Sequence, residues 1–149
     1  MSQTVYELDS GPDAPIVKFF TGQPDPALLA VANAALFRRY LIIIEGSKSE
    51  AQASGAGDVG SVTKIQADVP DEGDTSMANL EWMCRTVLER LDSFPADKAS
   101  RWLGFVQGVL AVRGLITVAE ERDHSRPLFH AAYRAGGIEP PASMQRVAE

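Results

Sequence analysis

The sequence predicts an α+β fold, in which a small mixed sheet with one helix precedes a compact helical unit. The first half carries short, β-favouring apolar runs between turn residues, whereas the second half repeats apolar residues at the three-and-four spacing of helices. An apolar content of 45% over 149 residues is enough for a hydrophobic core. We expect an acidic α/β subdomain at 1–74, a three-helix unit at 75–137 and a tail at 138–149.

Four segments of the first half have the composition of β-strands. Two of them flank a Ser-Gly-Pro-Asp turn cluster, and a third, Leu41–Ile44, is continuously apolar, as in a central strand buried on both faces. The fourth alternates apolar and polar residues with one slip in register. The predicted strands cover residues 4–8, 16–20, 41–44 and 61–69.

One helix is expected among these strands. Asp25 is followed by Pro26, the pattern of an N-cap with proline in the first helical position. Apolar residues then recur at helical spacing, which predicts a helix that ends near Arg39. Residues 46–60 are rich in Gly, Ser and Ala and predict a flexible loop, while the acidic residues 70–74 predict a linker.

The second half predicts a helical hairpin. Its first helix carries a full amphipathic stripe from Met77 to Leu91. A turn at residues 93–95 leads to the second helix, which has apolar residues from Trp102 to Leu110 and a glycine, Gly114, at its end. Because the connection is short, the two helices should be antiparallel.

A third, proline-interrupted helix follows. Thr117 and Glu120 form a capping box, T-x-x-E, at its start. Pro127 lies inside it and is expected to kink or restart the helix, because proline has no N–H and its ring clashes with the preceding turn. Gly136 and Gly137 should end it.

The composition limits which cellular compartments and which kinds of partner we expect. A single cysteine, Cys84, permits no intramolecular disulfide, and two histidines with one cysteine argue against structural zinc. The first ten residues lack the features of a signal peptide, and no apolar run approaches the roughly 18 residues of a membrane span. We therefore expect a cytoplasmic protein with no membrane partner, in the host cytoplasm if a phage encodes it. Residues 1–74 hold eleven acidic and five basic residues, a balance of −6, which disfavours direct nucleic-acid binding.

Two patterns point to cofactor or metal chemistry, and both have simpler structural explanations. Residues 55–60 read G-x-G-x-x-G, which can hold a pyrophosphate where a strand turns into a helix, but here a loop precedes it and a predicted strand follows. Glu120 and His124 lie one turn apart, but charges are normal at the start of a capped helix and no third ligand is in view. The neighbours of this pair are Glu121, Asp123 and His130. We expect no cofactor, no metal site and no catalytic residue.

Partner-binding residues are expected in both halves. Trp82 lies off the apolar stripe of its helix, where it either contacts a partner or is covered by the acidic half. Arg122 and Arg126 share one helix face and could hold a partner's carboxylate or phosphate, unless one of them satisfies carbonyls near the proline. The acidic residues that could compete for a basic groove on a partner are Asp68, Asp71, Glu72 and Asp74.

Ser100, Gly104 and Gly108 form a ridge of small residues on an otherwise bulky helix. Each glycine costs about 1 kcal/mol of helix propensity, so the close approach of another helix should compensate. The short connection favours the 77–91 helix in this role. The alternative is the same ridge in the second subunit of a homodimer.

Three groupings stand out in the second half: R-W-L-G at 101–104, Q-G at 107–108 and R-P-L-F-H at 126–130. In these groupings, the segment Arg101–Tyr133 resembles small phage and prophage accessory proteins of no assigned activity. The resemblance covers about the last half of the chain. It implies a phage context and supplies no catalytic residues.

Together these features favour a non-enzymatic accessory protein that binds and inhibits or modulates a host protein, such as a defence or regulatory factor. Two alternatives stay open. In one, the chain is a small-ligand or nucleotide-binding protein or enzyme, in which the 46–60 loop closes over a ligand and Arg122, Arg126 or His130 contacts it. In the other, the small-residue ridge builds an oligomeric assembly protein.

Overall fold

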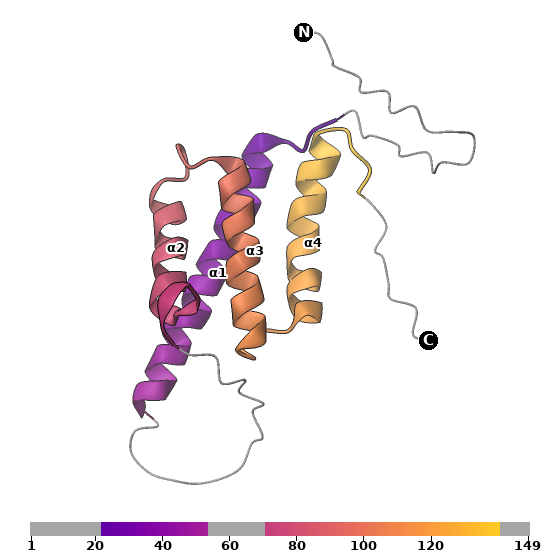
Figure 1. Ribbon diagram of the computed structural model, residues 1–149. Helices are drawn as coiled ribbons and strands as arrows, with labels where there is room; N and C mark the ends of the chain where they lie inside the picture. The colour runs from indigo at the N-terminus through magenta and orange to yellow at the C-terminus, as the bar shows by residue number, and fades with distance from the viewer. Residues whose placement is uncertain (1–21, 54–70, 141–149) are drawn as a thin grey trace, which may run out of the picture.

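The computed structural model describes residues 22–53 and 71–140, and all the secondary structure within these ranges is helical (Figure 1). The helices are α1 (Pro26–Ala53), η1 (Gly73–Thr75), α2 (Met77–Glu89), α3 (Ala96–Val112) and α4 (Val118–Ala135), η1 being a short 3-10 helix. The predicted α+β class is therefore wrong for the described part of the chain. The strands predicted at 4–8, 16–20 and 61–69 lie outside it.

The predicted strand Leu41–Ile44 is wrong because α1 runs through it. The start of the helix is as expected, since Asp25 Oδ1 accepts a hydrogen bond from the Leu28 amide at 2.9 Å. The predicted end near Arg39 is wrong, because α1 is 28 residues long and continues to Ala53. Ile44 is fully buried and Ile42 is 69% exposed, the one-sided pattern of a helix. Packing of that buried side outweighs the β-propensity of the isoleucines.

Because α1 extends to Ala53, the loop predicted at 46–60 is wrong for residues 46–53. Residues up to Ala53 belong to the last turns of α1. The rest of the loop, including the glycine pattern at 55–60, lies outside the described residues.

The helices predicted in the second half are confirmed, with their caps. Ser76 Oγ accepts from the Asn79 amide at 3.1 Å at the start of α2. Thr117 Oγ1 accepts from the Glu120 amide at 3.2 Å, which is one half of a capping box, and the Thr117 hydroxyl donates to Glu120 Oε2 at 2.7 Å. Gly114 has a φ of 71°, a left-handed conformation that suits glycine after the end of α3.

α4 continues through Pro127 as one helix, so the predicted restart does not occur (Figure 1). Proline removes the backbone hydrogen bond to the carbonyl four residues earlier, that of Asp123. Pro127 and Asp123 are both exposed, so water can reach the freed carbonyl. A proline on the solvent side of this helix is therefore tolerated.

Successive helices alternate in direction, and α1 packs against each of the other three (Figure 1). The core of the described residues is built from one face of each helix, with Leu36, Phe37, Tyr40 and Ile44 of α1 against Leu80, Cys84 and Val87 of α2 and Leu103, Val106 and Leu110 of α3. α3 and α4 both pack on α1 and hardly on each other. The bundle is consequently open between α3 and α4.

A buried ion pair joins α1 to α4. Glu121 is fully buried, and its Oε1 accepts from Arg39 Nε at 3.0 Å and from Arg39 Nη2 at 2.7 Å. The hydrogen bond that Arg39 donates to the Glu121 carboxylate raises the pKa of Arg39. Burial, and next the negative charge of Glu121, raises the pKa of the neighbouring Tyr40. Glu121 thus holds the two helices together, a role that the sequence pattern did not predict.

Among the described helices, α1 is the one with the length and apolar composition that a membrane span requires. In its most apolar window, 39% of the residues are buried inside the protein by the other helices. Packing in the core therefore accounts for part of its apolar character. The expected cytoplasmic location and the absence of a membrane partner stay predictions.

Candidate functional site

The first candidate site is a cluster of aromatic side chains on α2 and α3. Trp82 is 56% exposed, and its ring centroid lies 5.5 Å from that of Trp102. Phe94, in the connection, lies 5.1 Å from Trp102 in an edge-to-face arrangement. The Lys98 ammonium lies 4.9 Å from the Trp102 ring centroid, within cation–π range.

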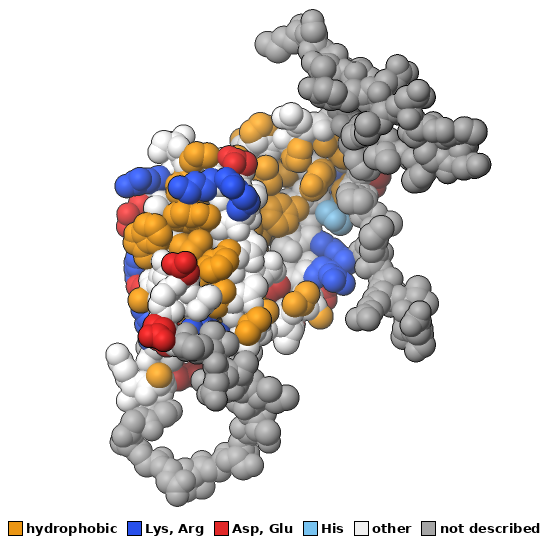
Figure 2. All heavy atoms as spheres, in the orientation of Figure 1, with side chains coloured by type: hydrophobic (Ala, Val, Ile, Leu, Met, Phe, Trp, Pro, Cys, Tyr) orange, Lys and Arg blue, Asp and Glu red, His pale blue; other side chains and the backbone are white. Residues whose placement is uncertain are grey.

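Along α3 the cluster continues as a second apolar stripe beside the buried one. Trp102, Phe105, Val109 and Val112 follow one another at three-and-four spacing, and Phe105 and Val112 are 39% and 59% exposed. We call Trp82, Phe94 and these four residues the α2–α3 aromatic surface. Figure 2 shows hydrophobic side chains gathered over this part of the molecule, with charged side chains around them.

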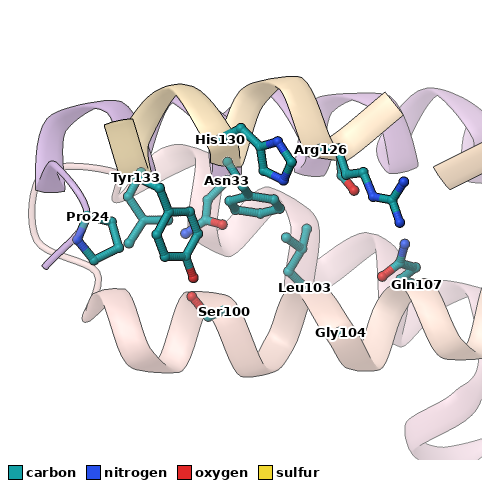
Figure 3. Close-up of a pocket in the computed structure, with 12 residues that line it drawn as sticks. Pro24, Asn33, Ser100, Leu103, Gly104, Gln107, Arg126, His130 and Tyr133 are labelled. Carbon is teal, nitrogen blue, oxygen red and sulfur yellow. The ribbon is translucent and has the colours of Figure 1, made fainter. Parts of the chain in front are cut away.

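The second candidate site is a groove of about 500 Å³ between α3 and α4, which we call the α3–α4 groove. Asn33 of α1 lies between its two walls (Figure 3). One wall is formed by Ser100, Leu103, Gly104 and Gln107 of α3, and the other by Arg126, Phe129, His130 and Tyr133 of α4. The groove exists because both helices pack on α1 and leave a gap between themselves.

The groove combines a buried amide with several polar side chains. Asn33 is only 3% exposed, and its Oδ1 has no hydrogen-bond partner among the described residues. Arg126 faces Gln107 across the groove, and Tyr133 faces Ser100 (Figure 3). Within the part of the chain that the structure describes, none of these four side chains makes a hydrogen bond or ion pair.

The small-residue ridge has a different environment from the one expected. A Cβ atom added at Gly104 or at Gly108 would meet no described atom within 4 Å, so the expected close approach of α2 does not occur. α3 packs on the bundle through its opposite face, which carries Leu103, Val106 and Leu110. Ser100 and Gly104 instead line the α3–α4 groove, and Gly108 is exposed. The homodimer alternative stays a prediction.

The two predicted arginines separate in the structure. Arg126 lines the α3–α4 groove, whereas Arg122 is exposed on α4 and does not. Neither guanidinium bonds to carbonyls around Pro127 among the described residues. The expected structural role for one of them therefore has no contact to support it in this part of the chain.

The four acidic residues predicted to bind a partner differ in their surroundings. Asp71 Oδ1 accepts from the Met77 amide at 2.8 Å and lies 3.3 Å from Arg113 Nη2, so it holds the start of α2. Glu72 and Asp74 are exposed. Asp68 lies outside the described residues.

The acidic and histidine side chains around Glu120 and His124 do not come together in one site. Glu120 accepts a hydrogen bond from the Thr117 hydroxyl, His124 is exposed, and His130 lies in the α3–α4 groove. In residues 22–53 and 71–140, no three His, Cys, Asp or Glu side chains gather as metal ligands would. Cys84 is buried, and its burial, followed by the charge of Glu81, raises its pKa to about 12.

The sequence singled out Trp82, Arg126, His130, Ser100 and Gly104, which lie in the two candidate sites, but as sites these stay predictions. It did not single out Trp102, Phe105 or Asn33 for either site. Phe105 and Trp102 had a usable signal, because a second apolar stripe on α3 exceeds what one buried face needs. Asn33 had none, since an asparagine within an apolar helix does not show which neighbours surround it. Comparisons with protein-family models, curated proteins and solved structures found no match. The resemblance to phage accessory proteins therefore stays a prediction.

Proposed function

We propose that this chain is a non-enzymatic binding protein that modulates a partner protein through the α2–α3 aromatic surface. The observation that carries the proposal is the exposure of Trp82 beside Trp102 and Phe105. Exposed tryptophan and neighbouring aromatic side chains are typical centres of protein interfaces. Burying the exposed half of Trp82 would contribute about 2–3 kcal/mol to binding, at about 25 cal/mol per Å².

The charges around the aromatic surface fit the same function. Lys98 lies over the Phe94 and Trp102 rings, and Arg101 forms an exposed ion pair with Asp97 at 3.0 Å. An apolar centre with a charged, solvated rim is the usual organisation of an interface. Such rim charges adjust the association rate and the choice of partner more than affinity.

The proposed partner is a host protein that the chain inhibits or modulates in the cytoplasm, as the phage resemblance implies. The acidic residues could also compete for a basic groove on the partner. Glu72 and Asp74 would then be the residues that bind this groove. Asp71 is a weaker candidate because the Met77 amide and Arg113 already engage its carboxylate.

Affinity capture tests the proposal. The tagged full chain is incubated with host-cell lysate, and bound proteins are identified by mass spectrometry. We expect a stoichiometric partner whose recovery falls at least about ten-fold with the double variant Trp82→Ala, Phe105→Ala, since truncation of central aromatic residues commonly costs 2 kcal/mol or more.

Val118→Ala is the matched control, because Val118 is 61% exposed but lies on α4. Circular dichroism and thermal unfolding establish that each variant folds. If the double variant and the control recover the partner equally, the aromatic surface is not the docking site. If no partner is recovered by the unsubstituted chain, the binding function itself is contradicted.

A further inference from the structure

Asn33 places a buried polar side chain beside the α3–α4 groove. The residue is 3% exposed, and no described residue donates to its Oδ1. Nearly all buried side-chain oxygens in proteins have a partner, because an unpaired buried polar atom is unfavourable.

A water molecule in the neighbouring cavity would not supply a hydrogen-bond donor to Asn33 Oδ1. Asn33 also borders a space of about 40 Å³ on its other side, which is otherwise lined by Ala, Val, Leu and Phe residues. A buried water needs two to four polar partners, and Asn33 would be the only polar side chain available there. The Asn33 amide is therefore a buried polar group with apolar residues around this space.

The charge of the groove favours an anion. The chain carries a net charge of −6, yet among the described residues no Asp or Glu lines this groove. Arg126 lines it and makes no ion pair with any described residue, and His130 follows one turn later on the same face of α4. A guanidinium binds carboxylate and phosphate groups through two parallel hydrogen bonds.

Between the polar groups the groove is apolar and open. Leu103 and Phe129 line its middle, and Gly104 leaves the α3 backbone uncovered there. An aromatic or branched aliphatic group can lie against these surfaces. Gly104 then has a reason to interrupt a helix of bulky residues, because a side chain at that position would project into the groove.

Size and polarity favour a small molecule over a docked helix. About 500 Å³ lies within the range of small-molecule sites, which combine apolar walls with a few converging polar groups. A docked helix offers an apolar face about 10 Å wide and matches an apolar groove. Here Arg126 and Gln107 face each other in one place, and Tyr133 and Ser100 in another, so polar groups bound a short apolar span (Figure 3).

We propose that the α3–α4 groove binds a small organic anion with an apolar body. Arg126 holds the carboxylate or phosphate, and Leu103 and Phe129 contact the body over Gly104, beside the buried Asn33 side chain. This site uses a different side of α3 from the α2–α3 aromatic surface, and the proposal does not depend on that surface binding a protein.

Nuclear magnetic resonance of the 15N-labelled full chain tests the site with three probes. Phenylbutyrate supplies a carboxylate and an apolar body, phenylbutyramide supplies the same body without charge, and phenyl phosphate supplies the other anion. We expect both anions to shift the Gly104 and Gln107 amide signals saturably, with a dissociation constant on the order of 1 mM for probes of this size. The amide should bind at least about ten-fold more weakly, because it cannot pair with Arg126. Whichever anion binds more tightly identifies the preferred group.

Two glycines on one helix provide a matched pair of variants. Gly104→Leu fills the groove, whereas Gly108→Leu adds the same side chain one turn away, where it does not line the groove. We expect Gly104→Leu to abolish the shifts, Gly108→Leu to retain them, and Arg126→Gln to weaken anion binding about ten-fold while leaving phenylbutyramide unchanged.

Three results would contradict the proposal. Equal binding of phenylbutyrate and phenylbutyramide would show that the groove does not recognise the negative charge. Equal binding to the Gly104→Leu and Gly108→Leu variants would show that the probe binds outside the groove. Absence of any shift at Gly104 and Gln107 with both anions would overturn it as a whole. Thermal unfolding of each variant separates loss of binding from loss of the fold.

Discussion

At the scale of single residues, the contact between α1 and α4 depends on Glu121. Its carboxylate is fully buried and is compensated by Arg39, whose side chain is 36% exposed. Taking a carboxylate out of water is unfavourable unless a partner charge and hydrogen bonds replace the water. The main contribution of Arg39 to stability is therefore to compensate the buried negative charge of Glu121.

Removal of Arg39 should consequently destabilise the protein strongly. We expect Arg39→Ala to lower the free energy of unfolding by about 2–4 kcal/mol, somewhat below the usual 3–5 kcal/mol because the arginine is partly solvated. Urea denaturation measures this change. The double variant Arg39→Met, Glu121→Leu should recover most of the loss, because it leaves no buried charge.

The neighbouring arginine provides the control. Arg38 is exposed, and Arg38→Ala should change the free energy of unfolding by less than about 0.5 kcal/mol. Equal effects of the Arg38 and Arg39 substitutions would show that the ion pair does not hold α1 against α4.

A second residue-scale prediction concerns acid. Glu81 accepts hydrogen bonds from Lys48 of α1 and from Arg85 at 3.0 Å, and these contacts lower its pKa below the ordinary value of 4.5. Because the folded pKa is the lower one, the contribution to stability is complete above about pH 4.5 and is lost as the pH falls through the folded pKa.

The Glu81→Gln variant tests this pH dependence. The contacts of Glu81 with Lys48 and Arg85 should stabilise the folded protein by less than about 1 kcal/mol. The two basic side chains are 39% and 47% exposed, so water screens both ion pairs. Urea unfolding is followed from neutral pH to about pH 3, and the difference in stability between the original protein and Glu81→Gln should shrink towards the acid end. A difference that stays constant over this range would contradict the assignment.

At the scale of elements, the sequence predicted α2, α3 and α4 well and α1 badly, for a physical reason. The second-half helices each bury one clear stripe and carry local caps such as Ser76 and Thr117. In α1, the isoleucines at 42–44 have β-branched side chains, and local propensity there points away from the true structure. Only the packing of Tyr40 and Ile44 against other helices decides the outcome, and that packing is not encoded locally.

The candidate sites show the same division. Trp82 and Arg126 are recognisable from their own helices, because each lies where a core residue is not needed. Their environments depend on residues from other helices, such as Trp102 beside Trp82 and Asn33 behind the groove. Tertiary packing brings these residues together, so a pattern within one helix could not predict the sites.

The exposed ridge on α3 leads to an element-scale prediction. A Cβ at Gly108 meets nothing described within 4 Å, so Gly108→Ala should raise the free energy of unfolding by about 0.5–1 kcal/mol through helix propensity alone. Thermal or urea unfolding measures the gain. A loss of stability would mean that another segment or a second subunit packs closely on the ridge, and sedimentation at several concentrations would then identify a homodimer by its mass.

At the scale of the whole molecule, the two proposed sites share α3 and use different sides of it. Trp102 and Phe105 belong to the α2–α3 aromatic surface, whereas Ser100 and Gly104 line the α3–α4 groove. Their common support is the buried face of α3, which is packed on the core through Leu103 and Val106. A helix fixed in this way gives neither site a second arrangement through which it could influence the other.

We therefore expect the two sites to act independently. The Trp82→Ala, Phe105→Ala variant should bind phenylbutyrate with an affinity within about two-fold of the original protein, and Arg126→Gln should recover the captured partner in unchanged amount, because substitutions at separate sites without shared contacts usually add. Phenylbutyrate titrations and affinity capture with both variants measure this. Reciprocal changes of ten-fold or more would instead correspond to a coupling free energy above about 1.4 kcal/mol, and α3 would then have to shift on the core when either site is occupied.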